Sequence, residues 1–300
     1  MSIREDNRRL ETLIGGLRAG GISRRRFLVG AAQLGIAAPI AGALASAASR
    51  RTAAAPRAWL QDNGKTLVVA IAQQTVQLDP AIAGSNGYGD ILPLTDNMTE
   101  GLTRYKPGTI ELEPALAEKW EQSTDGLSYV FHLRPNVTFH DGTKFDAKAA
   151  ALNVMRQLDE KNPDHFEGFT YTEIAYSDVV KAEATGDLEV TLTLSKPSVI
   201  VPANLAVFAA DVVSPAALEK AGLDFGQAPV GTGPFKFDHW TKDVELVMTA
   251  YDDYWGGRPK LDRVIWQTIG DDTVRLTSLQ TGAIDVANQI DFKDAATVKN

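Results

Sequence analysis

The most constraining feature of this sequence is a short apolar run early in the chain. Residues 66–72 read Thr-Leu-Val-Val-Ala-Ile-Ala, without a charged side chain. Such a run is typical of a strand buried on both faces, as parallel strands are when helices cover a sheet. The sequence therefore predicts an α/β fold with this segment as the first strand.

A break and a glycine-rich loop follow the predicted strand. Leu78-Asp79-Pro80 interrupts the apolar pattern, and the loop reads Gly84-Ser85-Asn86-Gly87-Tyr88-Gly89. An amphipathic stretch then predicts a helix over 90–105. Glycines between a strand and a helix also occur in phosphate-binding loops, but the Lys-Ser/Thr pair of a P-loop is missing and the spacing does not fit a dinucleotide site. The pattern therefore predicts strand, loop and helix without a phosphate site.

Later segments show clear periodicity. Residues 127–140 alternate between apolar and polar and turn at Pro135-Asn136, which predicts two short strands. Residues 144–158 carry apolar side chains at helical spacing, and Asp146 near their start is a capping residue. Further strands are predicted over 187–194, 235–240, 244–249 and 263–269.

Composition and the rare residues argue against most catalytic and metal chemistry. The 300 residues are 44% hydrophobic and 23% charged, within the globular range, and include no cysteine. Disulfides, thiolate zinc sites, iron–sulfur clusters and cysteine nucleophiles are therefore excluded. The four histidines have no zinc spacing, and no Gly-x-Ser-x-Gly motif occurs. The acid pairs Asp252-Asp253 and Asp271-Asp272 are typical of solvated surface. We predict no catalytic residue, no metal site and no cofactor, and we expect that the chain is not an enzyme.

Charge is divided unevenly along the chain. Residues 1–55 contain nine arginines and three acidic residues, a net charge of +6, whereas the remainder contains 21 basic and 35 acidic residues, a net charge of −14. An acidic body lacks the basic face that phosphate binding requires, which argues against nucleic acid as a partner. The positive charge belongs to a segment with another purpose.

That segment has the three parts of an export signal. Residues 23–28 read Ser-Arg-Arg-Arg-Phe-Leu, a weakly apolar Ala- and Gly-rich stretch covers 30–48, and small residues suited to cleavage lie near its end. The core is similar to the twin-arginine motif. Its signal residues are Arg24, Arg25, Phe27 and Leu28. A membrane anchor over 27–48 is the alternative, since that length spans a bilayer. The low hydrophobicity favours a cleaved signal.

Five motifs in the acidic part occur in a characteristic order. They are Leu112-Glu113-Pro114-Ala115-Leu116-Ala117-Glu118-Lys119-Trp120 with its continuation to Arg134, Val137-Thr138-Phe139-His140-Asp141-Gly142-Thr143, Pro229-Val230-Gly231-Thr232-Gly233-Pro234-Phe235, Tyr254-Trp255-Gly256-Gly257-Arg258-Pro259, and Leu279-Gln280-Thr281-Gly282-Ala283-Ile284-Asp285. In residues, order and spacing they resemble the extracytoplasmic solute-binding proteins of the peptide/nickel type, family 5, which serve ABC importers. The resemblance covers nearly the whole acidic part.

Each motif also has a structural interpretation. His140-Asp141-Gly142 is typical of a turn, because Gly supplies positive φ and Asp accepts from nearby amides. The segment 231–234, with two glycines beside a proline, predicts a tight connection near a hinge. His132 and His140 share strand parity, which would place both on one face. Tyr254 and Trp255 are candidates for the core or for the lining of a site.

The resemblance implies that the fold consists of two α/β lobes. Family members have the type II periplasmic-binding-protein fold, with two lobes, a hinge and a subdomain inserted in the first lobe. Mapped here, residues 1–55 are the twin-arginine signal peptide and 56–102 begin the first lobe. The remaining divisions are 103–205 for the inserted subdomain, 206–285 for the second part of the first lobe, and 286–300 for the start of the second lobe. Most of the second lobe is then missing, so that the sequence is expected to be truncated on its C-terminal side.

The resemblance also implies a function. It predicts a protein that captures di- or oligopeptides in the periplasm and delivers them to an ABC permease in the inner membrane, after export by the twin-arginine translocase. The lobe-one residues expected to contact ligand are Gly84, Ser85, Asn86, Tyr88 and Tyr254. The acidic side chain that pairs with the α-amino group of the ligand in peptide-binding relatives belongs to the second lobe and has no counterpart here.

Two other functions remain open on the sequence. Relatives of one fold vary in their ligands, so the ligand is alternatively a nickel chelate, haem or an oligosaccharide. A twin-arginine-exported hydrolase is the alternative from another class, although no motif supports its chemistry. Turnover of a substrate distinguishes the hydrolase from a binding protein, and colour or bound metal distinguishes a chelate or haem from a peptide.

Overall fold

The computed structural model describes residues 65–83, 88–165, 171–291 and 294. The chain divides into two compact units, Met1–Gly64 and Lys65–Asn300, and every described residue belongs to the second. The predicted export signal, with Arg24, Arg25, Phe27 and Leu28, therefore lies outside the described residues. No helix in the described part is long and apolar enough to cross a membrane.

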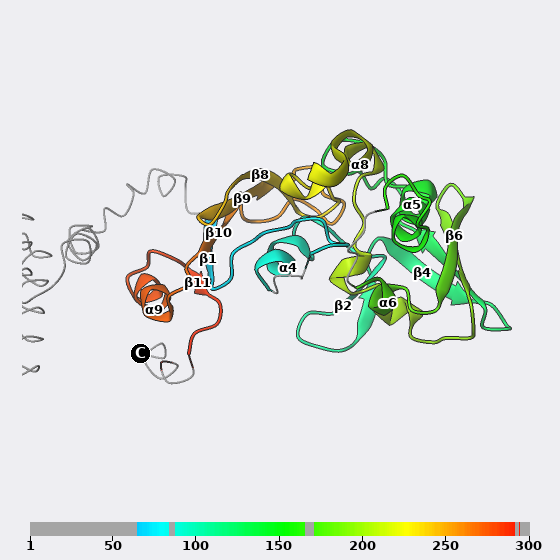
Figure 1. Ribbon diagram of the computed structural model, residues 1–300, viewed down its shortest axis with the longest axis horizontal. Helices are drawn as coiled ribbons and strands as arrows, with labels where there is room; N and C mark the ends of the chain where they lie inside the picture. Colours follow the sequence, from blue (N-terminus) through cyan, green and yellow to red (C-terminus); the bar gives the residue numbers. More distant parts are fainter. Residues whose placement is uncertain (1–64, 84–87, 166–170, 292–293, 295–300) are drawn as a thin grey trace, which may run out of the picture. The chain divides into compact units, whose positions relative to one another are not determined.

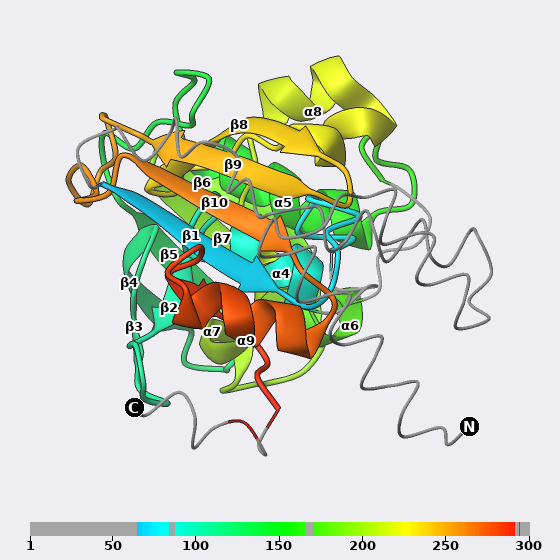
Figure 2. The ribbon, with the colours of Figure 1, turned by 90° about the vertical axis from the view of Figure 1, so that its left-hand side faces the viewer.

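A mixed five-stranded sheet forms the first layer of this unit. Its strands run in the order β11-β1-β10-β9-β8, and Figure 2 shows β1, β10, β9 and β8 side by side. Their bounds are β1 Thr66–Ile71, β8 Phe235–Thr241, β9 Glu245–Ala250, β10 Arg263–Thr268 and β11 Val286–Ala287. The pairs β1–β10 and β1–β11 are parallel, whereas β10–β9 and β9–β8 are antiparallel. Strand β1 is therefore central to the parallel part, which explains its uninterrupted apolar sequence.

A four-stranded antiparallel sheet forms a second layer, drawn from the middle of the chain. Its order is β4-β5-β7-β6. The strands are β4 Ala117–Gln122, β5 Ser128–Leu133, β6 Val179–Gly186 and β7 Glu189–Leu194. Helix α5 (Ala147–Leu158) packs against β6 and β7 (Figure 1), and Phe131, Leu192 and Val154 are buried in the shared core. The alternation seen in the sequence is thus the burial of one face of β5 and β7.

Short elements connect and cover the two sheets. They are α4 Tyr88–Leu94, the hairpin β2 Thr103–Tyr105 and β3 Leu112–Pro114, α6 Thr172–Ala175, α7 Val201–Asn204, η1 Phe208–Ala210, α8 Pro215–Ala221, η2 Gly222–Gln227 and α9 Asp272–Gln280. Helices begin where the sequence supplies caps. Asp146 accepts from the Ala149 N–H at 2.9 Å, and Asp271 accepts from the Val274 N–H at 2.9 Å.

The α/β fold class and most predicted elements are confirmed. The strands expected over 66–72, 187–194, 235–240, 244–249 and 263–269 are β1, β7, β8, β9 and β10, and the helix expected over 144–158 is α5. The boundaries differ by at most three residues, as is usual for element ends.

The helix predicted over 90–105 is confirmed only in its first part, and its extension to residue 105 is wrong. Helix α4 ends at Leu94, after the internal Pro93, and the chain turns through Asp96, whose φ is 57°. The Asn97 side-chain amide donates to the carbonyls of Leu92 at 3.0 Å and Thr95 at 3.2 Å, which satisfies groups at the helix end. Beyond this turn Met98 and Leu102 are buried in the core ahead of β2, which begins at Thr103.

The second strand expected within 127–140 is also wrong. The segment after β5 makes only one bridge, between Thr138 and Lys144. That bridge closes the predicted turn, in which Gly142 has a φ of 82° and Asp141 Oδ1 accepts from the Thr143 N–H at 2.9 Å. The interpretation of His140-Asp141-Gly142 as a turn is therefore confirmed.

Candidate functional site

The site predicted from the sequence begins where β1 ends. The residues that follow β1, β10 and β11 lie at one edge of the five-stranded sheet, because these three strands are parallel; we call it the carboxyl edge. The Ile269 N–H donates to the Ile71 carbonyl at 2.9 Å, and the Asn288 N–H donates to the Ala70 carbonyl at 2.8 Å. Ligands of open α/β sheets bind outside the carboxyl ends of parallel strands. This edge is the first candidate for a binding site.

The predicted ligand loop follows this edge. Gly84, Ser85 and Asn86 lie outside the described residues, and Tyr88 opens α4, although its side chain is not described. The chain returns beside the edge at Gly89. A Cβ atom on Gly89 would lie 2.5 Å from the Gln74 carbonyl oxygen, so that only glycine allows this close approach. The start of α4 is therefore held against the residues that leave β1.

The segment between β1 and the loop is fixed by buried side chains. Asp90 is fully buried in the first turn of α4, and its Oδ1 accepts from the backbone N–H groups of Val76 at 2.6 Å and Gln77 at 3.1 Å. Gln77 Oε1 accepts from the N–H groups of Leu78 at 2.8 Å and Asp79 at 2.9 Å. These bonds satisfy an irregular backbone that lies largely out of water.

A buried ion pair fixes the turn that enters the loop. The Arg156 guanidinium, on α5, donates to Asp79 Oδ1 at 2.7 Å and to Oδ2 at 2.9 Å, and the two side chains are 0% and 1% exposed. The Asp79 carbonyl accepts from the Ala83 N–H at 2.7 Å, directly before the loop. Helix α5 thus positions the entry of the loop, although it belongs to the other layer. Both ends of the predicted loop are anchored.

Tyr254 lies at the other end of the sheet. It is in the connection between β9 and β10, and the partner residues Thr66 and Arg263 show that β1 and β10 both start at that end. The structure therefore does not bring Tyr254 together with the residues that follow β1. Its hydroxyl donates to Glu100 Oε1 at 2.7 Å. Any ligand contact of Tyr254 would then use its ring.

Glu100 is the centre of a buried polar network at this second end. Its carboxyl is 2% exposed, and Oε2 accepts from Thr232 Oγ1 and from Trp255 Nε1, both at 2.9 Å. Burial raises the pKa of Glu100, and the three hydrogen bonds oppose that change. The Arg134 guanidinium stacks 4.2 Å above the Trp255 ring. The network joins the Gly231–Pro234 connection to the Tyr254-Trp255 motif.

We expect this network to tolerate an amide but not a hydrocarbon. In Glu100→Gln, the amide oxygen replaces Oε2 as acceptor and the amide nitrogen donates to the Tyr254 hydroxyl, so the loss should be about 1 kcal/mol. Glu100→Leu leaves three donors without acceptors, and we expect a loss of about 3 kcal/mol or more. Urea unfolding of both variants at pH 7 measures this difference. Equal losses would show that the hydrogen bonds of Glu100 do not stabilise the fold.

His140 holds the Gly231–Pro234 connection from the opposite side. Its Nε2 lies 2.9 Å from the Gly233 carbonyl oxygen and therefore donates, while Nδ1 accepts from the Gly231 N–H at 3.4 Å. A Cβ atom on Gly231 would lie 2.1 Å from the Met98 carbonyl oxygen, and one on Gly233 would lie 2.3 Å from that of Asn97. The connection is as tight as predicted; its closeness to a hinge remains a prediction. His132, in contrast, lies 3.2 Å from Glu189 and 3.5 Å from Glu121, and has different partners from His140.

The His140 contacts predict a loss of stability in mild acid. Burial lowers the pKa of His140 from 6.5 to about 4, so between these values the unfolded chain binds a proton that the native state does not. Stability from this group is complete above pH 6.5 and is lost as the pH falls towards 4. We expect the stability advantage of the protein over His140→Gln to shrink by about 2–3 kcal/mol between pH 7 and pH 4. An advantage that is constant with pH, in parallel urea titrations, would contradict this.

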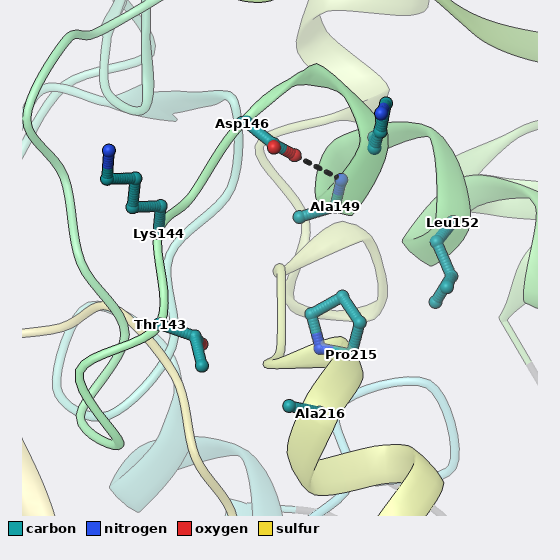
Figure 3. Close-up of a pocket in the computed structure, with 8 residues that line it drawn as sticks. Thr143, Lys144, Asp146, Ala149, Leu152, Pro215 and Ala216 are labelled. Carbon is teal, nitrogen blue, oxygen red and sulfur yellow. Dashed lines mark hydrogen bonds between the residues drawn. The ribbon is translucent and has the colours of Figure 1, made fainter.

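The described residues also form an open cavity, which is lined by neither the carboxyl edge nor the Glu100 network. It has a volume of about 260 Å³ and lies between the starts of α5 and α8, where Figure 3 shows Lys144, Asp146 and Pro215 around it. None of the predicted ligand residues lines it. In the described part of the chain no group of three His, Asp or Glu side chains is arranged to hold a metal ion. Asp252, Asp253, Asp271 and Asp272 are exposed, as predicted.

Sequence reasoning missed most of the anchoring residues. Asp79 was noted only as part of a chain break, and Arg156, Asp90, Glu100 and Arg275 were not singled out. Asp90 and Arg156 carried a signal, because each is a single charged residue among apolar neighbours, and such a residue must find a buried partner. The identity of that partner depends on the fold: Asp79 and Arg156 are 77 residues apart, and Asp90 accepts from N–H groups 13 and 14 residues away.

Comparison with known proteins gives a consistent result. The family model for bacterial extracellular solute-binding proteins, family 5 (middle), matches residues 111–300. The glutathione-binding protein GsiB of Escherichia coli (strain K12) is 33% identical over 236 residues, which are 78% of this chain and 44% of that protein. GsiB of Pectobacterium atrosepticum is 33% identical over 237 residues. The chain spans less than half the length of these relatives.

Solved structures show the same similarity. The periplasmic binding protein DppA from Helicobacter pylori, in complex with the peptide STSA, superposes with a TM-score of 0.71 at 31% identity, over 78% of this chain and 48% of that one. NikZ from Campylobacter jejuni, in complex with Ni(L-His), superposes with a TM-score of 0.68 at 28% identity, over 79% of this chain and 45% of that one. Such neighbours have the type II periplasmic-binding-protein fold, and the partial coverage fits one lobe of it.

Proposed function

Because the chain belongs to the family 5 bacterial extracellular solute-binding proteins, we propose that it is the solute-capturing component of an ABC importer with a short peptide as its ligand. The match of the family model to residues 111–300 supports solute capture, and the likeness to the ABC transporter-associated protein DppA supports the importer role. The peptide is supported by the likeness to glutathione-binding proteins, since glutathione is itself a peptide, and to a structure with a bound peptide. The cargo would be delivered to a permease in the inner membrane.

The proposed site is the carboxyl edge together with the loop Gly84–Tyr88. The anchored segments on either side of this loop, at Asp79 and Asp90, preform one wall of a binding site. A peptide against such a wall is held mainly through its main chain, with water filling the side-chain pockets. This arrangement binds peptides of different sequence.

The proposed division into lobes is supported by the sheets except at its last boundary, because β11 (Val286–Ala287) pairs with β1 in the five-stranded sheet. The five-stranded sheet takes its strands from residues 66–71 and 235–287, whereas the four-stranded sheet lies between them in sequence. We assign 56–102 and 206–285 to the first lobe, 103–205 to the inserted subdomain and 286–300 to the start of the second lobe. Ligand contacts available only between two lobes shift an open–closed equilibrium, and the closed shape is recognised by the permease.

A ligand panel tests the proposal. The dipeptide Met-Leu, glutathione and Ni(II)–L-histidine are each titrated while thermal unfolding is followed, because a ligand at 100 times its Kd stabilises by about 2.7 kcal/mol. We expect a rise in Tm with the peptides. Tyr88→Ala should abolish the rise, whereas Tyr105→Ala, at an exposed position, should retain it. A rise with Ni(II)–L-histidine alone would support the second candidate, a nickel-chelate protein, which the likeness to NikZ favours. Product formation from a peptide would contradict both.

Export by the twin-arginine route is proposed from the sequence of residues 23–28. The family is extracellular, so the chain needs a route across the membrane. We expect Arg24→Lys combined with Arg25→Lys to leave full-length precursor in the cytoplasm, because the translocase reads the arginine pair. Immunoblots of periplasmic and cytoplasmic fractions measure this. Normal export of the double variant would contradict it.

A further inference from the structure

Arg275, on α9, is one of the two largest fully buried side chains in the described part of the chain. Its guanidinium bonds are almost all to the backbone. Nε donates to the Asn288 carbonyl at 2.9 Å, Nη1 donates to the Ile269 carbonyl at 2.6 Å, and Nη2 donates to the Gln289 carbonyl and to Asp272 Oδ1. Arg275 therefore pairs with no buried acid. Its guanidinium is held in place by backbone carbonyls, and it holds those backbone segments in return.

The three carbonyls belong to two segments, one before and one after α9 in sequence. Ile269 is the first residue after β10, and Asn288 and Gln289 are the first two after β11. These strands flank β1 on either side (Figure 2). Gln289 has a φ of 57°, a left-handed conformation that is uncommon for a residue other than glycine. Arg275 donates to this residue, at the point where the chain changes direction.

We infer that Arg275 is a positioning residue that couples the segments directly after β10 and β11, so that they keep one arrangement at the carboxyl edge. We call these two segments the exits of the strands. Only arginine has planar donors in sufficient number to reach three carbonyls and a carboxylate at once. Lysine has the same charge but a compact, flexible head group. Coupled exits keep the wall of the site preformed before ligand arrives, which lowers the ordering cost of binding.

The use of this coupling in ligand capture rests on the proposed function, whereas the coupling itself does not. Two amides report it directly, since the N–H groups of Ile269 and Asn288 donate to the carbonyls of Ile71 and Ala70. Opening of either exit breaks its bond and exposes that amide to exchange. Hydrogen exchange of the 300-residue chain therefore measures the coupling without any ligand.

The experiment compares Arg275→Lys and Arg275→Met with the unaltered chain by residue-resolved hydrogen exchange. We expect both amides to exchange at least about tenfold faster in each variant, and by similar factors, while amides of β5 are unchanged. Arg258→Lys is the matched control, because Arg258 is an exposed arginine that pairs with Asp252 and Asp262. Millimolar guanidinium chloride, but not sodium chloride, should restore protection in Arg275→Met. If Arg275→Met fails to fold, the exchange rates of Arg275→Lys provide the test.

Three results would overturn the inference. They are faster exchange of α9 alone, faster exchange at only one exit, and an equal increase in β5, which would show a general loss of stability. Titration of the same variants with Met-Leu separates the two proposals. Coupled exits with no peptide binding in the unaltered chain would leave this inference standing and contradict the proposed peptide function.

Discussion

Replacing Arg156 with methionine should lower the free energy of unfolding by about 3–5 kcal/mol, because it leaves the Asp79 carboxylate buried without its partner. Asp79 is 1% exposed and receives both guanidinium bonds from Arg156. No solvent is available to replace them. Urea unfolding followed by tryptophan fluorescence measures the loss at pH 7.

A double variant separates the ion pair from the packing of its side chains. Asp79→Asn combined with Arg156→Met removes both charges and keeps an acceptor for the Ala81 N–H, which donates to Asp79 Oδ1 at 3.1 Å. We expect the double variant to be more stable than the sum of the single variants predicts, by about 2 kcal/mol or more. A loss below about 1 kcal/mol in Arg156→Met would contradict the assignment of this pair as the anchor of the loop.

Gly89→Ala should weaken peptide binding by about a hundredfold, which corresponds to about 2.7 kcal/mol. The new Cβ atom would lie 2.5 Å from the Gln74 carbonyl oxygen and 2.8 Å from that of Gln73, so the start of α4 must move away from the carboxyl edge. The contacts are with backbone, which cannot rotate aside. Calorimetric titration with Met-Leu measures the change in Kd.

Gly186→Ala is the matched control for this change. Gly186 lies in β6, and its new Cβ atom would meet only the flexible side chain of Glu189, at 3.4 Å. We therefore expect an unchanged Kd. Circular dichroism establishes that both variants are folded. An unchanged Kd in Gly89→Ala would show that the approach of α4 to β1 does not shape the site.

The sequence could predict the elements whose cause is local. The apolar run of β1, the alternation of β7 and the Asp146 cap of α5 each depend on neighbouring residues, and all were found. The helix expected over 90–105 was too long, because Asn97 closes a turn that hydrophobic periodicity does not reveal. The turn at Gly142 was found because its chemistry lies within three residues.

The candidate site was less accessible for a physical reason. Its anchors depend on partners that only the fold brings together, such as Asp79 with Arg156, 77 residues away, and Arg275 with the residues after β10 and β11. Tyr254 was expected with the loop because motif order does not show which end of a sheet a connection occupies. The parallel register of β1 and β10 decides that question. The fold could be predicted from the family resemblance, whereas the position of each side chain could be known only from the three-dimensional structure.

Native mass spectrometry of the protein recovered from the periplasm of its own host tests export and solute capture together. One spectrum reports the start of the mature chain and any molecule it carries. We expect a protein without its first 45 to 55 residues, together with a mass increment that is released intact on activation and has the mass of a short peptide. A periplasmic protein that carries nothing, before and after incubation with peptides, would contradict a role in solute capture.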